Sequence, residues 1–236
     1  MLAEPLARLR EAPERAALLL DVDGTLAPIV TRPQDAAVPA ETRAELERLA
    51  GRYALVACVS GRTAADARRV VGLDGLLYVG SHGLELEPES VAWSQTLRDF
   101  AATVPWPVED KGLTVSFHYR GAPDEAAAHA ELVVVAERAR SAGLRARFGR
   151  KVLELLPPID ANKGTAIRRV LAGRGLRRAL YAGDDTTDLD AFHALDDLEL
   201  GVRVAVASAE GPPELRAAAD AVVASPAELV ELLREL

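Results

Sequence analysis

The sequence predicts an α/β protein that has a parallel β-sheet in its core and an inserted α+β segment. Short apolar runs alternate with helical segments along residues 1–100 and again along residues 160–236, which is typical of right-handed βαβ units. Between residues 101 and 159 the pattern changes to an alternating strand, a helix and a hairpin, as in an antiparallel sheet. We therefore expect a core domain made of residues 1–100 and 160–236, and a cap domain at 101–159.

The strands and helices of the core are predicted from apolar periodicity and from the residues that end it. A short apolar run bounded by turn-forming residues indicates a buried strand. An amphipathic segment that ends at a glycine indicates a helix. The expected strands are 16–22, 53–59, 76–79, 179–182, 202–207 and 221–224, and the expected helices are 2–12, 41–50, 64–71, 163–172, 226–236 and one that ends near residue 195.

The inserted segment follows a different pattern. Residues 113–119 alternate apolar and polar side chains, which indicates a half-buried strand. A helix is expected at 124–142, where Gly143 ends it, and residues 144–148 and 152–156 are expected to form a hairpin. The stretch 87–106 has no clear fold signal, so the surroundings of Trp93 and Trp106 are left open.

Composition limits the functions that fit this chain. Its 236 residues are 49% hydrophobic, enough for a sizeable core, and their net charge of −8 disfavours binding to nucleic acid. Cys58 is the single cysteine, so we expect a buried thiol and a reducing cytoplasm. No apolar run reaches the roughly 18 residues of a membrane span, and the first 15 residues lack the pattern of a signal peptide. We therefore expect a cytoplasmic protein that does not bind membranes.

Two aspartates directly follow the first predicted strand. Asp21 and Asp23 are separated by one residue and precede Gly24 and Thr25. Residues i and i+2 lie on the same side of a strand, and open α/β sheets bind ligands at the carboxyl ends of their strands. Two neighbouring carboxylates repel each other unless a proton or a cation is close. The pattern favours a catalytic pair over the alternative of an Asx turn that only closes the strand.

Three further polar clusters are predicted at the same edge of the sheet. They are Ser60 with Gly61 and Arg62, Lys163 at a helix start, and Asp184 with Asp185 and Asp188. Aspartate can attack phosphorus, a second carboxylic acid can protonate the leaving oxygen, and Mg²⁺ prefers carboxylate oxygens. Each cluster also has an ordinary alternative, such as a helix N-cap or a surface lysine. Together the clusters predict phosphoryl transfer with Mg²⁺ as the cofactor.

In order and spacing, the four motifs resemble those of the haloacid dehalogenase superfamily of phosphohydrolases. The resemblance implies a Rossmann-like core, with the α+β cap placed as in the superfamily's sugar-phosphatase branch. It also implies that Asp21 is the nucleophile that forms an aspartyl-phosphate and that Asp23 is the general acid and base. The implied phosphate-binding residues are Ser60, Gly61, Arg62 and Lys163. The implied Mg²⁺ ligands are Asp21, the backbone carbonyl of Asp23, Asp184 and Asp185, with Thr25 and Asp188 in supporting positions.

A narrower resemblance, to the trehalose-6-phosphate phosphatase family, covers almost the whole chain. It rests on residues 80–85, 110–112, 118–120, 151–154 and 183–188, and on Phe192. The implied sugar contacts are His82, Glu85, Lys111, His118, Arg120 and Glu154. Charged hydrogen bonds of this kind suit a disaccharide, because they reject analogues that lack a hydroxyl. The residues alone leave open that the last four are ordinary polar residues of the cap.

One position departs from the family pattern. The family has Glu-Val-Arg-Pro where this chain has Glu154, Leu155, Leu156 and Pro157. The arginine therefore cannot be carried over to Leu156. The sequence leaves three candidates for the missing charge, which are Arg145, Arg147 and Arg150.

The resemblance implies a Mg²⁺-dependent hydrolase of trehalose biosynthesis that converts trehalose 6-phosphate to trehalose and phosphate. Two alternatives stay open: a related phosphatase that acts on another sugar phosphate, and a non-catalytic module that binds a sugar phosphate. We expect a monomer with a functional link to a trehalose-phosphate synthase.

Overall fold

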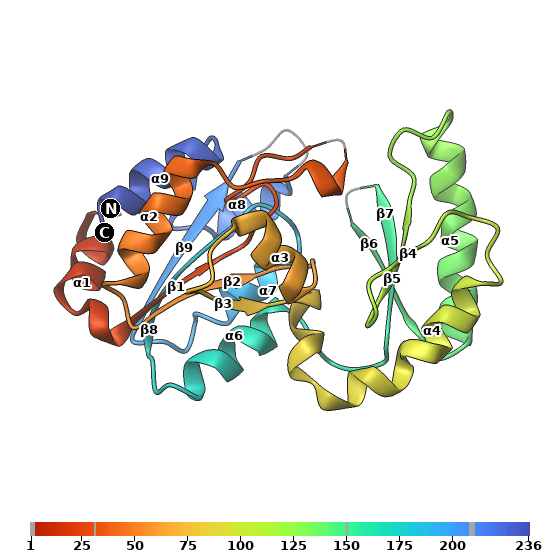
Figure 1. Ribbon diagram of the computed structural model, residues 1–236, viewed down its shortest axis with the longest axis horizontal. Helices are drawn as coiled ribbons and strands as arrows, with labels where there is room; N and C mark the ends of the chain where they lie inside the picture. Colours follow the sequence, from red (N-terminus) through yellow and green to blue (C-terminus); the bar gives the residue numbers. More distant parts are fainter. Residues whose placement is uncertain (1–2, 31, 150, 208–210) are drawn as a thin grey trace. The chain divides into compact units, whose positions relative to one another are not determined.

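The computed structural model describes residues 3–30, 32–149, 151–207 and 211–236, and Figure 1 shows their helices and strands. The chain divides into two compact units, unit 1 (Met1–Gly83 with Ala161–Leu236) and unit 2 (Leu84–Asp160). The predicted α/β class is confirmed, because one sheet is parallel with six strands and the other has four antiparallel strands. Among the described residues, no helix has the length and apolar character needed to cross a membrane.

Unit 1 is built on the six-stranded sheet, whose strands follow the order β10-β9-β8-β1-β2-β3. Figure 1 labels β9, β8, β1, β2 and β3 of this sheet. The two central strands, β1 and β8, pair in parallel from Ala16 and Arg178 onward. Every residue of β1 is buried, as its continuous apolar run predicts, and Cys58 is buried in β2 as expected. The strands are β1 (Ala16–Leu20), β2 (Leu55–Val59), β3 (Leu77–Val79), β8 (Arg178–Gly183), β9 (Leu200–Val206) and β10 (Ala221–Val223).

Among the helices of unit 1, α3 follows β2 and α6 precedes β8. Thr63 caps α3 by accepting the backbone N–H of Asp66, and Asn162 caps α6 in a capping box with Thr165. These caps fix where Arg62 and Lys163 emerge next to the sheet. The helices are α1 (Ala3–Glu11), α2 (Ala40–Ala50), α3 (Ala64–Val71), α6 (Lys163–Ala172), α7 (Asp188–His193), α8 (Pro213–Ala218) and α9 (Pro226–Arg234), and 3₁₀ turns lie at Pro13–Arg15 and Pro33–Asp35.

Unit 2 contains the antiparallel sheet, with the strand order β4-β5-β7-β6. Phe117 and Leu153 are buried in its apolar cluster together with residues of helix α5 (Glu125–Ser141). Residues at alternate positions point to the other face of the sheet, which carries Glu154 and Arg147 in register with each other. The 3₁₀ turn Ser81–Leu86 runs along the chain from the end of unit 1 into unit 2. The other elements of unit 2 are a 3₁₀ turn at Pro88–Trp93, α4 (Ser94–Ala101), β4 (Glu109–Asp110), β5 (Val115–His118), α5 (Glu125–Ser141), β6 (Arg145–Gly149) and β7 (Val152–Leu156).

Unit 2 begins earlier than the expected cap boundary at residue 101. Leu97 and Ala101 of α4 are buried in the same cluster as Phe117, so this segment packs with the inserted residues. Trp93 and Trp106 pack against that cluster too, and the Trp106 indole donates a 2.9 Å hydrogen bond to the carbonyl of His118. The sequence had no clear signal here because 3₁₀ turns and one eight-residue helix lack a long periodic pattern.

Candidate active site

The carboxyl end of β1 presents Asp21, which directly follows Leu20. Its backbone N–H donates to the carbonyl of Ala182 on β8, which continues the strand pairing to this point. Lys163, the first residue of α6, places its Nζ 2.8 Å from Asp21 Oδ1. The Lys163 side chain is only 2% exposed, so the alternative of a surface lysine is wrong.

The acidic segment after β8 meets the same lysine. Lys163 Nζ lies 2.6 Å from Asp188 Oδ1. Asp188 Oδ2 accepts the backbone N–H groups of Asp184 and Asp185 at 2.8 and 2.9 Å. Carboxylate oxygens of Asp21, Asp184 and Asp188 all lie within 4.8 Å of one another, and all three residues are buried. The fold thus brings together residues from three separate motifs of the sequence.

Burial dominates the electrostatics of this cluster. It raises the pKa of the Asp21 carboxyl well above 3.8, Lys163 opposes the shift, and Asp188 and Asp184 add to it. Burial alone would lower the pKa of Lys163, but the charges of Asp188 and Asp21 raise it above its usual value. Three carboxylates against one ammonium leave an excess of negative charge when all are ionised.

The donor set fits a hard divalent cation. A divalent cation would offset the excess negative charge, and carboxylate oxygens are the donors that such ions prefer. Both oxygens of Asp188 already accept hydrogen bonds, so this side chain is less suited to bind an ion than the other two carboxylates of the cluster, Asp21 and Asp184. Asp185 lies outside the three-carboxylate cluster, and its Oδ1 accepts the backbone N–H of Thr186. A metal contact by Asp185 or by the Asp23 carbonyl therefore stays a prediction.

A glycine allows the turn after β1 to approach Asp184. Gly24 has φ +79°, and a Cβ on it would lie 2.0 Å from Asp184 Oδ2. A side chain at this position would therefore displace the carboxylate. The neighbouring Thr25 is fully buried, and its hydroxyl lies 3.5 Å from Asp184 Oδ1, at the limit of a hydrogen bond.

The second motif lies beside Asp23. Arg62 donates from Nε and Nη2 to the two oxygens of Asp23, each at 2.7 Å, which is the bidentate geometry that guanidinium favours. The Ser60 hydroxyl accepts the backbone N–H of Arg62 at 3.2 Å. Arg62 also donates to Asp66 at 2.5 Å. Asp66 was not predicted, although its i, i+4 spacing from Arg62 is a signal for such a pair.

Strained backbone places His82 next to this motif. Ser81 and His82 have φ values of +49° and +53°, which non-glycine residues adopt at a cost that is common at functional sites. The N–H of His82 donates to the carbonyl of Ser60 at 2.9 Å. A Cβ on Gly61 would lie 2.5 Å from His82 Nε2, so glycine is needed for this close approach.

Tyr181 is a second residue that the sequence did not identify. Its hydroxyl donates to Asp188 Oδ1 at 2.6 Å, and the side chain is fully buried. In the sequence it stands within the apolar run of β8, which resembles an ordinary core position. The available signal was the hydroxyl itself, since a buried tyrosine usually needs a hydrogen-bond partner.

In unit 2, the predicted sugar contact Glu154 is buried and lies near Lys111, another predicted contact. Glu154 is 6% exposed, so the alternative of a solvated strand residue is wrong for it. Arg147 Nη2 donates to Glu154 Oε2 at 2.5 Å, and the Thr114 hydroxyl donates to Oε1 at 3.2 Å. Lys111 Nζ lies 3.6 Å from Glu154 Oε1.

The other predicted contacts of unit 2 are more exposed. His118 Nε2 lies 2.7 Å from Glu109 Oε2, with 43% of the His118 side chain exposed. Glu85 and Arg120 are exposed as well, and their roles stay predictions.

The structure distinguishes the three candidates for the missing arginine. Arg147 faces Glu154, whereas Arg145, although paired with Leu156 in the strand register, donates to the carbonyl of Ile159 at 2.5 Å. Arg150 lies outside the described residues. Arg147 is therefore the candidate that contacts a predicted sugar-binding residue.

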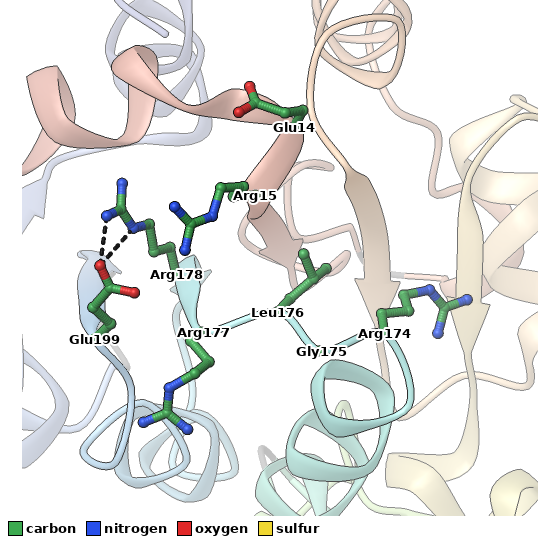
Figure 2. A pocket seen from close by; sticks show the side chains of 8 residues that line it. All are labelled: Glu14, Arg15, Arg174, Gly175, Leu176, Arg177, Arg178 and Glu199. Carbon is green, nitrogen blue, oxygen red and sulfur yellow. Dashed lines mark hydrogen bonds and ion pairs between the residues drawn. The ribbon is translucent and has the colours of Figure 1, made fainter.

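An arginine-rich cavity of about 210 Å³ lies elsewhere, where Arg15 precedes β1 and Arg178 begins β8 (Figure 2). Figure 2 shows Arg174 and Arg177 pointing in different directions, and Arg178 is paired with Glu199 at 2.5 Å. These guanidinium groups do not converge on one point, and the cavity includes none of the predicted site residues. We therefore place the candidate active site at Asp21 and its neighbours.

Comparison with known proteins points to one family. The family model described as trehalose-phosphatase matches residues 19–107 and 94–226. A trehalose-phosphate phosphatase of Mycobacterium marinum is 38% identical over 203 residues, which cover 77% of this chain and 52% of the relative. An uncharacterized glycosyl hydrolase of Mycobacterium tuberculosis is 36% identical over 217 residues, which cover 80% of this chain but 16% of the relative. The chain thus spans about half or less of these two relatives.

The solved structures agree with the family match. A crystal structure of a trehalose-6-phosphate phosphatase related protein superposes with a TM-score of 0.71 at 28% identity and covers 92% of this chain and 95% of its own. The match of the family model extends over most of the sequence and includes Asp21, Ser60, Lys163 and Asp184. The chain belongs to the trehalose-phosphatase family.

Proposed function

We propose that this protein is a Mg²⁺-dependent phosphatase that hydrolyses trehalose 6-phosphate to trehalose and phosphate. The observation that carries the proposal is the buried cluster at the end of β1, where Lys163 lies between Asp21 and Asp188 and Asp184 stands next to them. A carboxylate held by an ammonium at a strand end is suited to attack phosphorus. The names of the relatives support trehalose 6-phosphate as the substrate.

In the proposed reaction, an Asp21 oxygen attacks phosphorus and the bond to the sugar oxygen breaks. Asp23 gives that oxygen a proton, and Asp23 then takes a proton from the water that hydrolyses the aspartyl-phosphate. Lys163 offsets negative charge on Asp21 and on the phosphoryl group. Arg62 holds both oxygens of Asp23, so proton transfer requires Asp23 to leave or to share this guanidinium.

The cofactor in this proposal is Mg²⁺, held by Asp21, the Asp23 carbonyl and Asp184, with Asp185 as a further candidate. When bound, it supplies positive charge that stabilises the transferring phosphoryl group. Asp188 and Thr25 act as supports, because Asp188 contacts Lys163 and Thr25 lies next to Asp184. A monomer, a functional link to a trehalose-phosphate synthase and a place in the cytoplasm also belong to this proposal.

The first prediction is that the chain releases phosphate from trehalose 6-phosphate when Mg²⁺ is present and stops when EDTA removes it. The specificity constant for trehalose 6-phosphate should exceed those for glucose 6-phosphate and sucrose 6-phosphate. A colorimetric phosphate assay measures all of these rates. If another sugar phosphate has the larger constant, the enzyme is a related phosphatase. If no substrate and no metal gives phosphate release, the chain is a binding module and the proposal is wrong.

We also propose that residues of unit 2 bind the sugar, and that His82 of unit 1 is a sugar contact as well. The proposed contacts in unit 2 are Glu85, Lys111, His118, Arg120 and Glu154, and Arg147 supplies the charge that the family has at the position of Leu156. The contact between Arg147 and Glu154 supports this assignment.

The second prediction concerns Arg147. Arg147→Ala should raise the KM for trehalose 6-phosphate about tenfold, because a charged hydrogen bond contributes roughly that much to affinity, while kcat changes little. Arg145→Ala is the matched control on the same strand and should leave KM unchanged, because Arg145 bonds the carbonyl of Ile159. Steady-state kinetics of the two variants measure both kcat and KM. Equal KM values for both would contradict the role of Arg147.

A further inference from the structure

The Asp188 carboxylate connects three parts of unit 1. Its Oδ2 accepts the N–H groups of Asp184 and Asp185, and its Oδ1 accepts Lys163 Nζ and the Tyr181 hydroxyl, both at 2.6 Å. Asp188 is fully buried. Because four donors converge on this one carboxylate, its orientation sets both the position of Lys163 and the course of the loop that carries Asp184.

One of these four donors, the Tyr181 hydroxyl, comes from the middle of the core sheet. Tyr181 lies in β8, between Leu19 of β1 and Arg203 of β9. Its ring packs edge-to-face on Phe192 with 6.1 Å between the ring centroids. Burial raises the pKa of its hydroxyl well above 10.0, and the charge of Asp188 adds to the shift, so the hydroxyl keeps its proton and stays a donor.

Lys163 is shared between two carboxylates. Its Nζ lies 2.8 Å from Asp21 Oδ1 and 2.6 Å from Asp188 Oδ1. A second donor on Asp188 Oδ1 offsets part of the negative charge that attracts Lys163. Without that donor, Asp188 would hold Lys163 more strongly, and less of its charge would serve Asp21 and the phosphoryl group.

We infer that Tyr181 is a positioning residue, whose hydroxyl fixes Asp188 and thereby keeps Lys163 available to Asp21 and Asp184 in place for the metal. This inference rests on the proposed phosphatase function and extends it to a residue outside the four motifs. It acts through Asp188, without contact to substrate.

The test, our third prediction, compares Tyr181→Phe with Tyr78→Phe. Each variant removes one hydroxyl from a strand of the same sheet, and the Tyr78 hydroxyl donates to the carbonyl of Leu73 at 2.6 Å. Tyr181→Phe should lower kcat about tenfold, with KM within about twofold, because one buried hydrogen bond of about 1.4 kcal/mol is a factor of ten. It should also weaken Mg²⁺ binding severalfold in isothermal titration calorimetry without substrate. Tyr78→Phe should match the wild type in kcat, KM and Mg²⁺ affinity.

A third variant separates positioning from packing. Phe192→Leu loosens the ring contact of Tyr181 and keeps its hydroxyl, so it should lower the Tm but leave kcat and Mg²⁺ affinity close to those of the wild type. The inference is wrong if Tyr181→Phe stays within twofold of the wild type in kcat and Mg²⁺ affinity. It is also wrong if the losses in kcat follow the Tm across all three variants.

Calorimetry distinguishes the failure of this inference from a failure of the proposed function. If the wild type releases no phosphate from trehalose 6-phosphate, the substrate proposal fails. The Mg²⁺ affinities of Tyr181→Phe and Tyr78→Phe can still be compared, and they still test the role of Tyr181. If the wild type binds no Mg²⁺, both the metal site and the role of Tyr181 are wrong.

Discussion

Replacing Asp21 with asparagine is expected to abolish phosphate release while the protein stays folded. Asparagine has the shape of aspartate but cannot form the aspartyl-phosphate, so kcat should fall by at least about 10³-fold, as is typical when a nucleophile is removed. Burial raises the pKa of Asp21, which means that its ionised form is disfavoured in the folded state. A neutral side chain removes this cost, so the Tm should stay the same or rise. The phosphate assay and thermal unfolding measure the two effects.

Asp196→Asn is the matched control for this fourth prediction. It removes one carboxylate from an exposed pair with Arg203, which lies in unit 1 but outside the buried cluster. Its activity and Tm should both stay near those of the wild type. Near-normal turnover in Asp21→Asn would exclude Asp21 as the nucleophile.

Lys163→Met, our fifth prediction, should have the largest effect on stability. The substitution leaves the buried carboxylates of Asp21 and Asp188 without their ammonium partner. Removing one member of a buried ion pair typically costs about 3–5 kcal/mol, and we expect this loss in the free energy of unfolding at pH 7. Urea denaturation measures it. Phosphate release should be lost as well, because the charge that offsets Asp21 is gone.

The loss in the free energy of unfolding caused by Lys163→Met should become smaller as the pH falls. The folded-state pKa of Asp21 is already raised above 3.8 in the wild type, and without Lys163 it should rise further. Between the unfolded and the folded pKa, the folded state binds the proton more strongly, so lowering the pH through this window favours folding. Urea denaturation at pH 7 and pH 5 should therefore give a smaller difference from the wild type at pH 5.

Lys151→Met serves as the control for this substitution. Lys151 is paired with Glu125 at 2.7 Å, and both side chains are 36% exposed. Exposed pairs contribute about 0–1 kcal/mol, so this variant should lose little stability at either pH. A cost of less than about 1 kcal/mol for Lys163→Met would show that the buried charges are compensated by something other than Lys163.

Much of the fold could be predicted because its elements have clear periods. The run before Asp21 predicted β1, and the alternation at 113–119 predicted the strand that contains Phe117. The boundary of unit 2 could not be predicted, because the segment that follows Leu84 consists of short turns and a helix of eight residues. The position of such short elements depends on the apolar cluster against which they pack. That cluster exists only after the chain has folded.

The candidate site was predictable where chemistry follows a motif. Asp21, Lys163 and Asp184 belong to separate motifs, and parallel strands bring such residues to one edge of the sheet. Tyr181 and Arg147 could not be recognised in the same way. The role of Tyr181 depends on a hydroxyl inside an apolar run, and that of Arg147 depends on the register between β6 and β7. Hydrogen-bond partners and strand register are properties of the folded chain.

The pairing of β1 with β8 also has a consequence for folding. Ala16 lies opposite Arg178, so the centre of the core sheet joins segments that are far apart along the chain, on either side of unit 2. Contacts of such long sequence separation form slowly, because a large loop must close before they contribute. During synthesis, β1 and β2 are complete well before Lys163 and Asp184 are added. The buried acidic cluster therefore cannot form until synthesis has passed Asp188, and it assembles late in folding.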